Sequence, residues 1–240
     1  MSEYFTEADW RCHIVVQLAA PATLPGSSTA IPAGAIGKGV AIVDYQTNRV
    51  AFSIPSATAL FLSLSKRYYE SASITVQTFS STPKLQSLDD VKVFSYLENI
   101  MASIVFAYTA LEAFANEEIP DDYVHTIVKS KSSEIYRKSQ IERSLSLQTK
   151  LSDILPAIHE VPSPKGNKIW QDFLALEELR NNIIHMKTAD REHVGYSNHS
   201  IWSKLVTDPV PYVLPFAKLM IDYFYTLRKL KPHWYEQFPF

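Results

Sequence analysis

One stretch of the 240-residue chain gathers side chains suited to chemistry, the segment 169–187 with the sequence IWQDFLALEELRNNIIHMK. On a helix, which turns by about 100° per residue, its apolar side chains share one side: Ile169, Phe173, Leu176, Leu179, Ile183 and Ile184. Arg180 falls near the middle of that side. A guanidinium is costly in an apolar stripe unless it is paired and hydrogen-bonded. A functional site is one of the few reasons to hold a charge there.

His185 follows Arg180 by five residues, so on a regular helix it is rotated by roughly 140° and lies about 7.5 Å further along the axis. The two side chains therefore do not point together from one straight helix. Either the helix ends or distorts before His185, or the pair works across a seam with another helix or a second copy of the chain. Asn181 lies four residues before His185 and on its face.

A second long helix is predicted from Asp89 or Asp90, either of which can cap it, to about Glu117. Its apolar positions keep the helical period: Phe94, Leu97, Met101, Ile104, Val105, Tyr108, Leu111 and Ala115. Glu112 continues the row through Val105 and Tyr108, so we expect its carboxylate to face inward as the counter-charge of Arg180. Asn116 lies one turn further on the same side.

The segment 180–185, RNNIIH, has the form R-N-x-x-x-H and resembles the R-x4-6-H motif of the HEPN domain family. The segment 110–116, ALEAFAN, is similar to the family's early helix, in which a glutamate and an asparagine lie one turn apart. Lys150-Leu151, and the apolar residues ahead of Arg180, also resemble family features. The resemblance covers residues 88–230 and implies a mainly α, HEPN-like helical bundle.

This resemblance implies metal-independent endoribonuclease chemistry, in which the ribose 2′-OH attacks the adjacent phosphate and leaves a 2′,3′-cyclic phosphate. His185 would move the proton, Arg180 would stabilise charge on the phosphorane, and Asn181 would position the phosphate or the imidazole. Glu112 and Asn116 would support the site. The resemblance further implies no cofactor and no metal, a homodimer with a composite cleft, and a toxin or antiviral defence effector with an antitoxin or other defence-system partner.

A catalytically silent HEPN bundle that mediates dimerisation or binding is the alternative. In that case Arg180 and Glu112 form only a structural pair, and His185 is a helix-terminal histidine favoured by the helix dipole. A third interpretation makes the N-terminal segment the recognition element. Lys187 stands where HEPN toxins that are modified by a partner nucleotidyltransferase often have tyrosine, so that mode of neutralisation is not expected.

Basic residues are concentrated between residues 129 and 150, where Glu134 and Glu142 are the only acidic ones. The set is Lys129, Lys131, Arg137, Lys138, Arg143 and Lys150. Two interpretations stay open, a solvated helical face or contact with an RNA backbone. His193 and His199 lie in a polar segment, but their spacing matches no compact set of metal ligands, so we expect no metal site.

Residues 1–85 are expected to form a small N-terminal α/β element of unknown role, ahead of the bundle over 86–240. Strands are predicted over 10–18 and 73–79, a hairpin over 40–54 and a helix over 57–70. A linker is expected over 80–88. In the bundle, helices are predicted over 122–128, 132–143, 146–158, 168–187 and 215–229. The aromatic tail 233–240 is expected to pack on the bundle or on a partner.

Composition predicts an ordinary soluble, cytoplasmic globular protein, with 46% hydrophobic and 20% charged residues. A net charge of −2 gives no global attraction to nucleic acid or to a membrane. The single cysteine, Cys12, permits no disulfide within one chain and fits a reducing compartment. The first ten residues do not have the pattern of a signal peptide, and no apolar run is expected to cross a bilayer.

Overall fold

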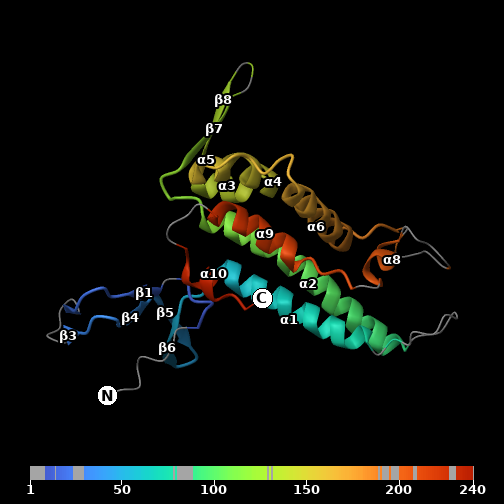
Figure 1. Ribbon diagram of the computed structural model, residues 1–240, viewed down its shortest axis with the longest axis horizontal. Coiled ribbons are helices and arrows are strands. Elements are labelled where there is room, and N and C mark those ends of the chain that lie inside the picture. Colours follow the sequence, from blue (N-terminus) through green and yellow to red (C-terminus); the bar gives the residue numbers. More distant parts are fainter. Residues whose placement is uncertain are drawn as a thin grey trace. The chain divides into compact units, whose positions relative to one another are not determined.

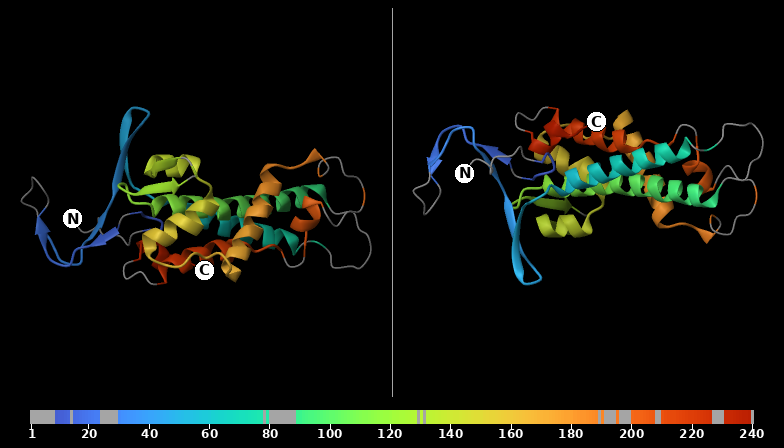
Figure 2. Two further views of the ribbon diagram at one scale, coloured as in Figure 1. Left: turned by 90° about the horizontal axis from the view of Figure 1, so that it is seen from above. Right: turned by 90° about the horizontal axis from the view of Figure 1, so that it is seen from below.

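The computed structural model describes residues 9–13, 15–23, 30–77, 79, 89–128, 130, 132–188, 190, 195, 200–207, 210–226 and 231–239. The chain forms two compact units, whose elements are drawn in Figure 1 and Figure 2. The first unit consists of residues 1–60 with 229–240, and the second of residues 61–228. The chain thus divides at Leu60, whereas the sequence suggested a change of character near residue 85. The predicted linker over 80–88 lies outside the described residues.

The first unit contains short antiparallel strand pairs: β1 (Val15–Gln17) with β4 (Ile36–Lys38), β2 (Ala22–Thr23) with β3 (Ala30–Ile31), and β5 (Val40–Tyr45) with β6 (Asn48–Ser53). The predicted hairpin is confirmed, because Tyr45 lies opposite Asn48 with two turn residues between them. Gln46 has a φ of 55° in that turn, the left-handed conformation that tight hairpin turns need. The strand predicted over 10–18 is reduced to β1.

The aromatic tail contributes a short helix to the first unit, α10 (His233–Gln237). Beyond it, Phe238 is buried and meets Trp10 edge to face, with 5.2 Å between the ring centroids. An aromatic contact therefore joins the segments that contain Trp10 and Phe238 within this unit. The sequence prediction for the tail named the bundle or a partner and not the N-terminal segment.

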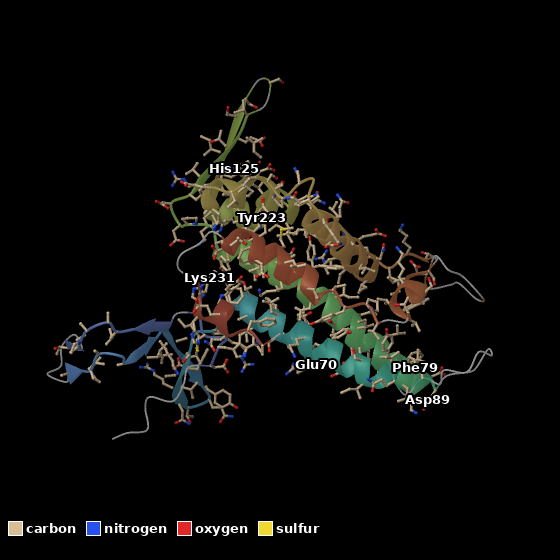
Figure 3. All side chains as sticks on the ribbon, in the orientation of Figure 1. Glu70, Phe79, Asp89, His125, Tyr223 and Lys231 are labelled. Carbon is tan, nitrogen blue, oxygen red and sulfur yellow. The ribbon has the colours of Figure 1, made fainter. Side chains whose placement is uncertain are left out.

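The second unit is mainly α-helical, as predicted. Its long helices are α1 (Ala57–Val76, which begins in the first unit), α2 (Asp90–Glu117), α6 (Lys168–Ile184) and α9 (Leu214–Tyr225). Helix α2 begins as predicted, because Asp89, labelled in Figure 3, accepts a hydrogen bond from the Val91 N–H at 2.9 Å. Such an N-cap satisfies one of the donors that a helix leaves free at its start.

Helix α1 includes the first residues of the strand predicted over 73–79, so that prediction is wrong. The Ser65 hydroxyl donates to the Ser103 carbonyl and the Ser103 hydroxyl donates to the Ser65 carbonyl, each at 2.9 Å. Tyr68 stacks on Phe106 with 5.7 Å between the ring centroids. This packing along α2 outweighs the strand preference of the β-branched residues at the end of α1.

Helices α2, α6 and α9 pack against one another and enclose the core. Its fully buried side chains include Ile104, Leu111, Phe114, Phe173, Leu176, Met220 and Phe224. Contrary to expectation, α2 is long and apolar enough to cross a bilayer by length and composition. This is weak evidence, because core helices of soluble proteins meet the same criterion. Nothing else in the described part of the chain indicates a membrane span.

A β-hairpin and a short helix replace the two helices predicted over 122–128 and 132–143. Strand β7 (Val124–Val128) pairs antiparallel with β8 (Ser133–Arg137), and α3 (Lys138–Ser144) follows directly. Along both strands, exposed side chains alternate with half-buried ones. That two-residue period, together with the β-branched residues of β7, favours a strand over a helix.

The predicted helix over 146–158 is present but contains a π-helical turn. Its parts are α4 (Leu147–Thr149), η1 (Lys150–Ile154) and α5 (Leu155–His159). Pro156 has no N–H to donate to the Ser152 carbonyl four residues earlier. The Ser163 hydroxyl donates to that carbonyl instead, at 2.7 Å. The proline therefore disturbs the helix, as expected, and a side chain satisfies the carbonyl that it leaves free.

Helix α6 begins after Asn167 and ends at Ile184, three residues before the predicted end. Trp170, Phe173, Leu176 and Ile183 are its buried residues. Ile184 was expected on the apolar side but is 50% exposed, because the helix ends there. The short helix α8 (Ile201–Leu205) precedes α9.

Candidate functional site

Three polar side chains lie along α2 at intervals of four residues, Tyr108, Glu112 and Asn116. Residues at this spacing share one face of a helix. Helix α2 packs against α6 and against α4, the helix that leads into η1. A polar stripe therefore runs through an interface that is otherwise apolar, and it contains both supporting residues that the sequence singled out.

Arg180 of α6 lies half-buried over the ring of Tyr108, with its Cζ 4.9 Å from the ring centroid. Its Nη1 donates a hydrogen bond to Asn181 Oδ1 at 3.0 Å. The face of an aromatic ring is an apolar surface that attracts a cation. Arg180 therefore faces the interior as predicted, but an aromatic ring takes the place of the expected carboxylate.

Glu112 and Arg180, both described, form no direct ion pair, which corrects the predicted contact. Their charges still interact through space, because Arg180 and Lys150 both act to lower the pKa of Glu112. Burial opposes them and is the larger effect, so the pKa of Glu112 is raised above its usual value. Glu112 is thus a half-buried carboxylate within the field of two cations from other elements.

Tyr108 is held from several sides. It is only 6% exposed and stacks on Phe173, and its hydroxyl donates to Glu177 Oε1 at 3.1 Å. The amide nitrogen of Gln148 donates to the other oxygen of Glu177. Burial, together with the charges of Glu177 and Glu112, raises the pKa of the Tyr108 phenol. The hydroxyl therefore stays protonated and remains a donor at neutral pH.

Lys150 is buried, with 5% of its surface exposed. Its ammonium donates to Asn116 Oδ1 and to the Glu142 carbonyl, each at 2.9 Å. Burial lowers the pKa of Lys150, while Glu112 and Glu142 act in the opposite direction. Asn116 thus holds Lys150, and its role in supporting the site stays a prediction.

The predicted basic set does not form one exposed surface. Lys150 is withdrawn as an RNA contact, because its ammonium is enclosed and hydrogen-bonded. Lys138 pairs with Asp121 at 2.8 Å, while Arg137 and Arg143 are exposed. Lys129 and Lys131 lie outside the described residues.

His185 stands at the end of α6, which fits the first of the alternatives left by the sequence and leaves a seam with a second copy as a prediction. The helix ends before it, and its φ and ψ of −112° and 45° are not helical. Its N–H donates to the Asn181 carbonyl at 2.9 Å. Its imidazole is exposed and has no hydrogen-bond partner within the described chain. Asn181, also exposed, lies between Arg180 and His185 in the motif and accepts a hydrogen bond from each of them.

The raised pKa of Glu112 predicts the effect of Glu112→Gln on stability. A carboxyl whose pKa is higher in the folded state contributes stability below its unfolded pKa and loses it as the pH rises through the folded value. The neutral glutamine is therefore expected to stabilise the fold at pH 7, by less than about 1 kcal/mol after solvent screening. Urea unfolding at pH 7 and pH 4 measures this, and the gain should vanish at pH 4.

Glu98→Gln is the matched control, because Glu98 is exposed on the same helix. It is expected to change the free energy of unfolding equally little at both pH values. A Glu112→Gln variant that is less stable than wild type at pH 7 would contradict the conclusion that burial is the main influence on the pKa of Glu112.

Sequence reasoning missed Tyr108, Glu177 and Gln148 as members of this site. Tyr108 was counted only as an apolar helix position, although it precedes Glu112 by one turn. Glu177 lies three residues before Arg180, a spacing that places both on one face of α6. The sequence feature that could have identified Tyr108 and Glu177 is a polar side chain one helical turn away from an inward-facing charged residue.

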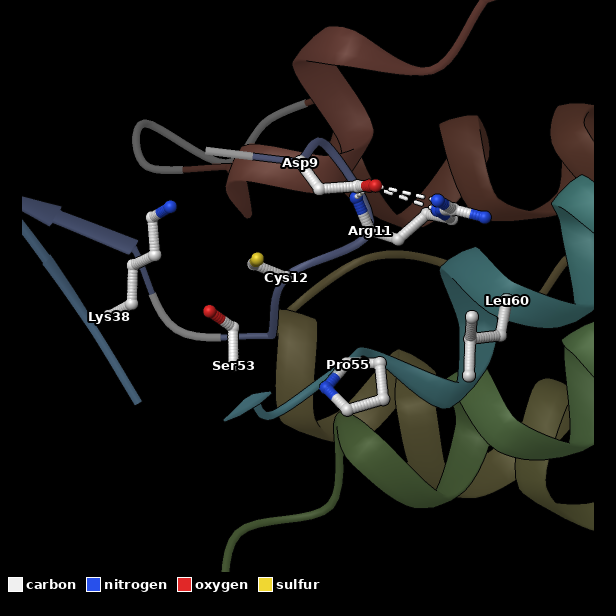
Figure 4. Close-up of a pocket in the computed structure, with 7 residues that line it drawn as sticks. All are labelled: Asp9, Arg11, Cys12, Lys38, Ser53, Pro55 and Leu60. Carbon is white, nitrogen blue, oxygen red and sulfur yellow. Dashed lines mark hydrogen bonds and ion pairs between the residues drawn. The ribbon is translucent and has the colours of Figure 1, made fainter. Parts of the chain in front are cut away.

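The first unit has a cavity of about 310 Å³, shown in Figure 4, whose lining includes Arg11, Cys12, Lys38 and Ser53. Arg11 pairs with Asp9 at 2.6 Å and holds the pKa of that carboxyl at about 2. Cys12 is buried, whereas the adjacent His13 is exposed. Within the described chain, no three His, Cys, Asp or Glu side chains are grouped to hold a metal ion. His193 and His199 are not among the described residues.

In chemical terms, the end of α6 presents a guanidinium, a carboxamide and an imidazole, and half-buried carboxylates and a buried ammonium lie on the elements behind it. A guanidinium and an imidazole at a helix end can bind an anion and exchange a proton with it. No family model, no curated protein and no solved structure matches the chain.

Proposed function

We propose that the second unit is a HEPN-type, metal-independent endoribonuclease with its site at the end of α6. The observation that carries the proposal is the placement of Arg180, which is fixed over Tyr108 with its neighbour Asn181 in contact. An arginine needed only for packing would be expected to take a carboxylate partner or to reach into water. Arg180 has no carboxylate partner among the described residues and lies half-buried over a ring, and the R-N-x-x-x-H motif coincides with this place.

In the proposed reaction, the 2′-oxygen of a ribose attacks the adjacent phosphorus and the bond from phosphorus to the 5′-oxygen breaks. The products are a 2′,3′-cyclic phosphate and a 5′-hydroxyl. His185 moves a proton at one of the two oxygens, for which an imidazole is suited near neutral pH. Arg180 stabilises the negative charge that builds on the phosphate oxygens. Asn181 orients the phosphate or the imidazole.

We further propose that the protein acts on RNA in the cytoplasm as a toxin or an antiviral effector. In this proposal two copies of the chain form a composite cleft, and an antitoxin or another defence component restrains them. The exposure of His185 at the end of α6 supports this, because a histidine there is open to a second copy and to a large substrate.

A catalytically silent HEPN bundle that mediates binding is the second candidate. The imidazole of His185 has no hydrogen-bond partner among the described residues, so no hydrogen bond from them orients it toward Arg180. In this alternative, the cation–π contact between Arg180 and Tyr108 only stabilises the packing of α6 on α2.

The ends of the RNA fragments distinguish the two candidates. Purified protein is incubated with a single-stranded RNA in buffer with EDTA, and fragment ends are identified by mass spectrometry. We expect 2′,3′-cyclic phosphate and 5′-hydroxyl ends, because the proposed chemistry uses an internal nucleophile and no metal. Protein carrying both Arg180→Ala and His185→Ala is the control for contaminating nucleases. Fragments that the double variant also makes, or cleavage that requires added metal, would contradict the proposal.

A further inference from the structure

We infer that Tyr108 and Glu177 form a positioning pair that sets the orientation of the Arg180 guanidinium. This inference rests on the proposed function, because it assigns to the pair the task of aiming Arg180 at a phosphate. Neither residue belongs to the R-N-x-x-x-H motif, and neither contacts the exposed imidazole of His185 in the described structure.

The pair is rigid because it is tied to several elements at once. Tyr108 extends from α2 and is buried, while Glu177 extends from α6 one turn before Arg180. One carboxylate oxygen of Glu177 accepts the Tyr108 hydroxyl, and the other accepts the amide of Gln148 from α4. The ring on which the guanidinium rests is therefore fixed at its hydroxyl and across its face, where it stacks on Phe173.

The ring leaves Arg180 able to bind an anion, which a carboxylate partner would not. A salt bridge would use the N–H groups at the edge of the guanidinium and neutralise its charge. An aromatic face contacts the plane of the group instead and leaves those N–H groups free. One N–H is used by Asn181, and the others have no acceptor among the described residues. This accounts for the missing direct contact between Arg180 and Glu112.

Two substitutions of Tyr108 separate the ring from its hydroxyl. Tyr108→Leu removes the ring, and Tyr108→Phe keeps it but loses the bond to Glu177. We expect Tyr108→Leu to lower kcat for RNA cleavage by roughly 10- to 100-fold with little change in KM. Tyr108→Phe and Glu177→Gln should each lower kcat by about threefold to tenfold, because the ring remains but is less well fixed. Circular dichroism melts verify that each variant is folded.

A double-mutant cycle tests whether Tyr108 acts through Arg180. Residual cleavage is measured in single turnover with excess enzyme, for Arg180→Ala alone and combined with Tyr108→Leu. If Tyr108 only positions Arg180, its loss has no further effect once Arg180 is absent. Equal losses of activity from Tyr108→Leu in both backgrounds would overturn the inference. Full activity of Tyr108→Leu together with an inactive Arg180→Ala would also overturn it, but this second result would leave the proposed function intact.

A readout independent of activity keeps the two proposals separable. The Nε–Hε signal of Arg180 in a nitrogen–proton NMR spectrum is assigned by its loss in Arg180→Ala. We expect this signal to be shifted by the ring current in the wild type and in Tyr108→Phe, and to return to the ordinary arginine position in Tyr108→Leu. An unshifted wild-type signal would refute the positioning pair. Wild-type cleavage by Arg180→Ala would refute the proposed role of Arg180 and with it the catalytic task of the pair, while a shifted signal would still show that the ring orients the guanidinium.

Discussion

Replacing Arg180 by alanine is expected to lower kcat for RNA cleavage by about 10³-fold. The size of this effect follows from the loss of charge stabilisation on the phosphorane, which is typically worth 10²- to 10³-fold for one well-placed donor. The fold should survive, because the half-buried guanidinium makes one cation–π contact and one hydrogen bond. The loss of these two interactions is expected to cost about 1 kcal/mol of stability. Initial rates on a labelled RNA measure the change in kcat, and thermal melts of the same samples measure the change in stability.

His185→Ala is the companion variant and should reduce kcat by 10²- to 10⁴-fold, the usual range for general acid–base catalysis. Lys187→Ala is the matched control, since Lys187 is exposed two residues beyond His185. It should cleave at the wild-type rate. Induced expression in cells gives a second measurement: wild type and Lys187→Ala are expected to arrest growth, and the other two variants are not. Arrest by all four proteins would remove the basis for an RNase at this site.

The long helices of the second unit could be predicted because their signals are local. Helix α2 has an N-cap residue, Asp89, directly before an apolar repeat of helical period, and no other part of the chain is needed to see it. The strand predicted over 73–79 failed for the opposite reason. Its residues have strand propensity, but the helix they extend packs along α2, and tertiary packing outweighs a weak local preference.

Some members of the candidate site could be predicted, whereas Tyr108, Glu177, Gln148 and the contacts between the members could not. Facing positions on α2 and α6 follow from helical periodicity, which is why Glu112 and Arg180 could be assigned to one interface. Whether the guanidinium then meets a carboxylate or a ring depends on a shift of one turn between the two helices. That shift is set by the packing of buried side chains such as Phe173 and not by a local pattern. The sequence therefore placed Arg180 on the inward side of α6 correctly and predicted the wrong contact for it.

Lys150 is a second case in which a local sequence pattern does not predict a tertiary contact. The charge run from 129 to 150 suggested a solvated helical face, and lysine is almost never fully buried unless it is paired. Lys150 still follows the regular helix of α4, because its N–H donates to the Ser146 carbonyl four residues earlier at 3.0 Å. Helical periodicity describes one helix and does not say which helices meet, so it could not place this ammonium beside Asn116 of α2.

Lys150→Ala is expected to destabilise the second unit by about 3 kcal/mol. The change removes a buried aliphatic stem and leaves the Asn116 and Glu142 acceptors without the donor that they share. Lys150→Met keeps most of the stem and should cost roughly half as much. Chemical unfolding followed by circular dichroism measures the difference, and the midpoint of thermal unfolding should fall by roughly 6–12 °C for the alanine variant.

Arg143→Ala is the control, because Arg143 belongs to the same charge run but is exposed on α3. Its free energy of unfolding should stay within about 0.5 kcal/mol of the wild type. The two residues should also separate in RNA binding: Arg143→Ala weakens it if α3 contacts the backbone, whereas Lys150→Met acts on stability alone, since its ammonium is enclosed. A Lys150→Met protein of wild-type stability with weakened RNA binding would show that the ammonium reaches the substrate after all.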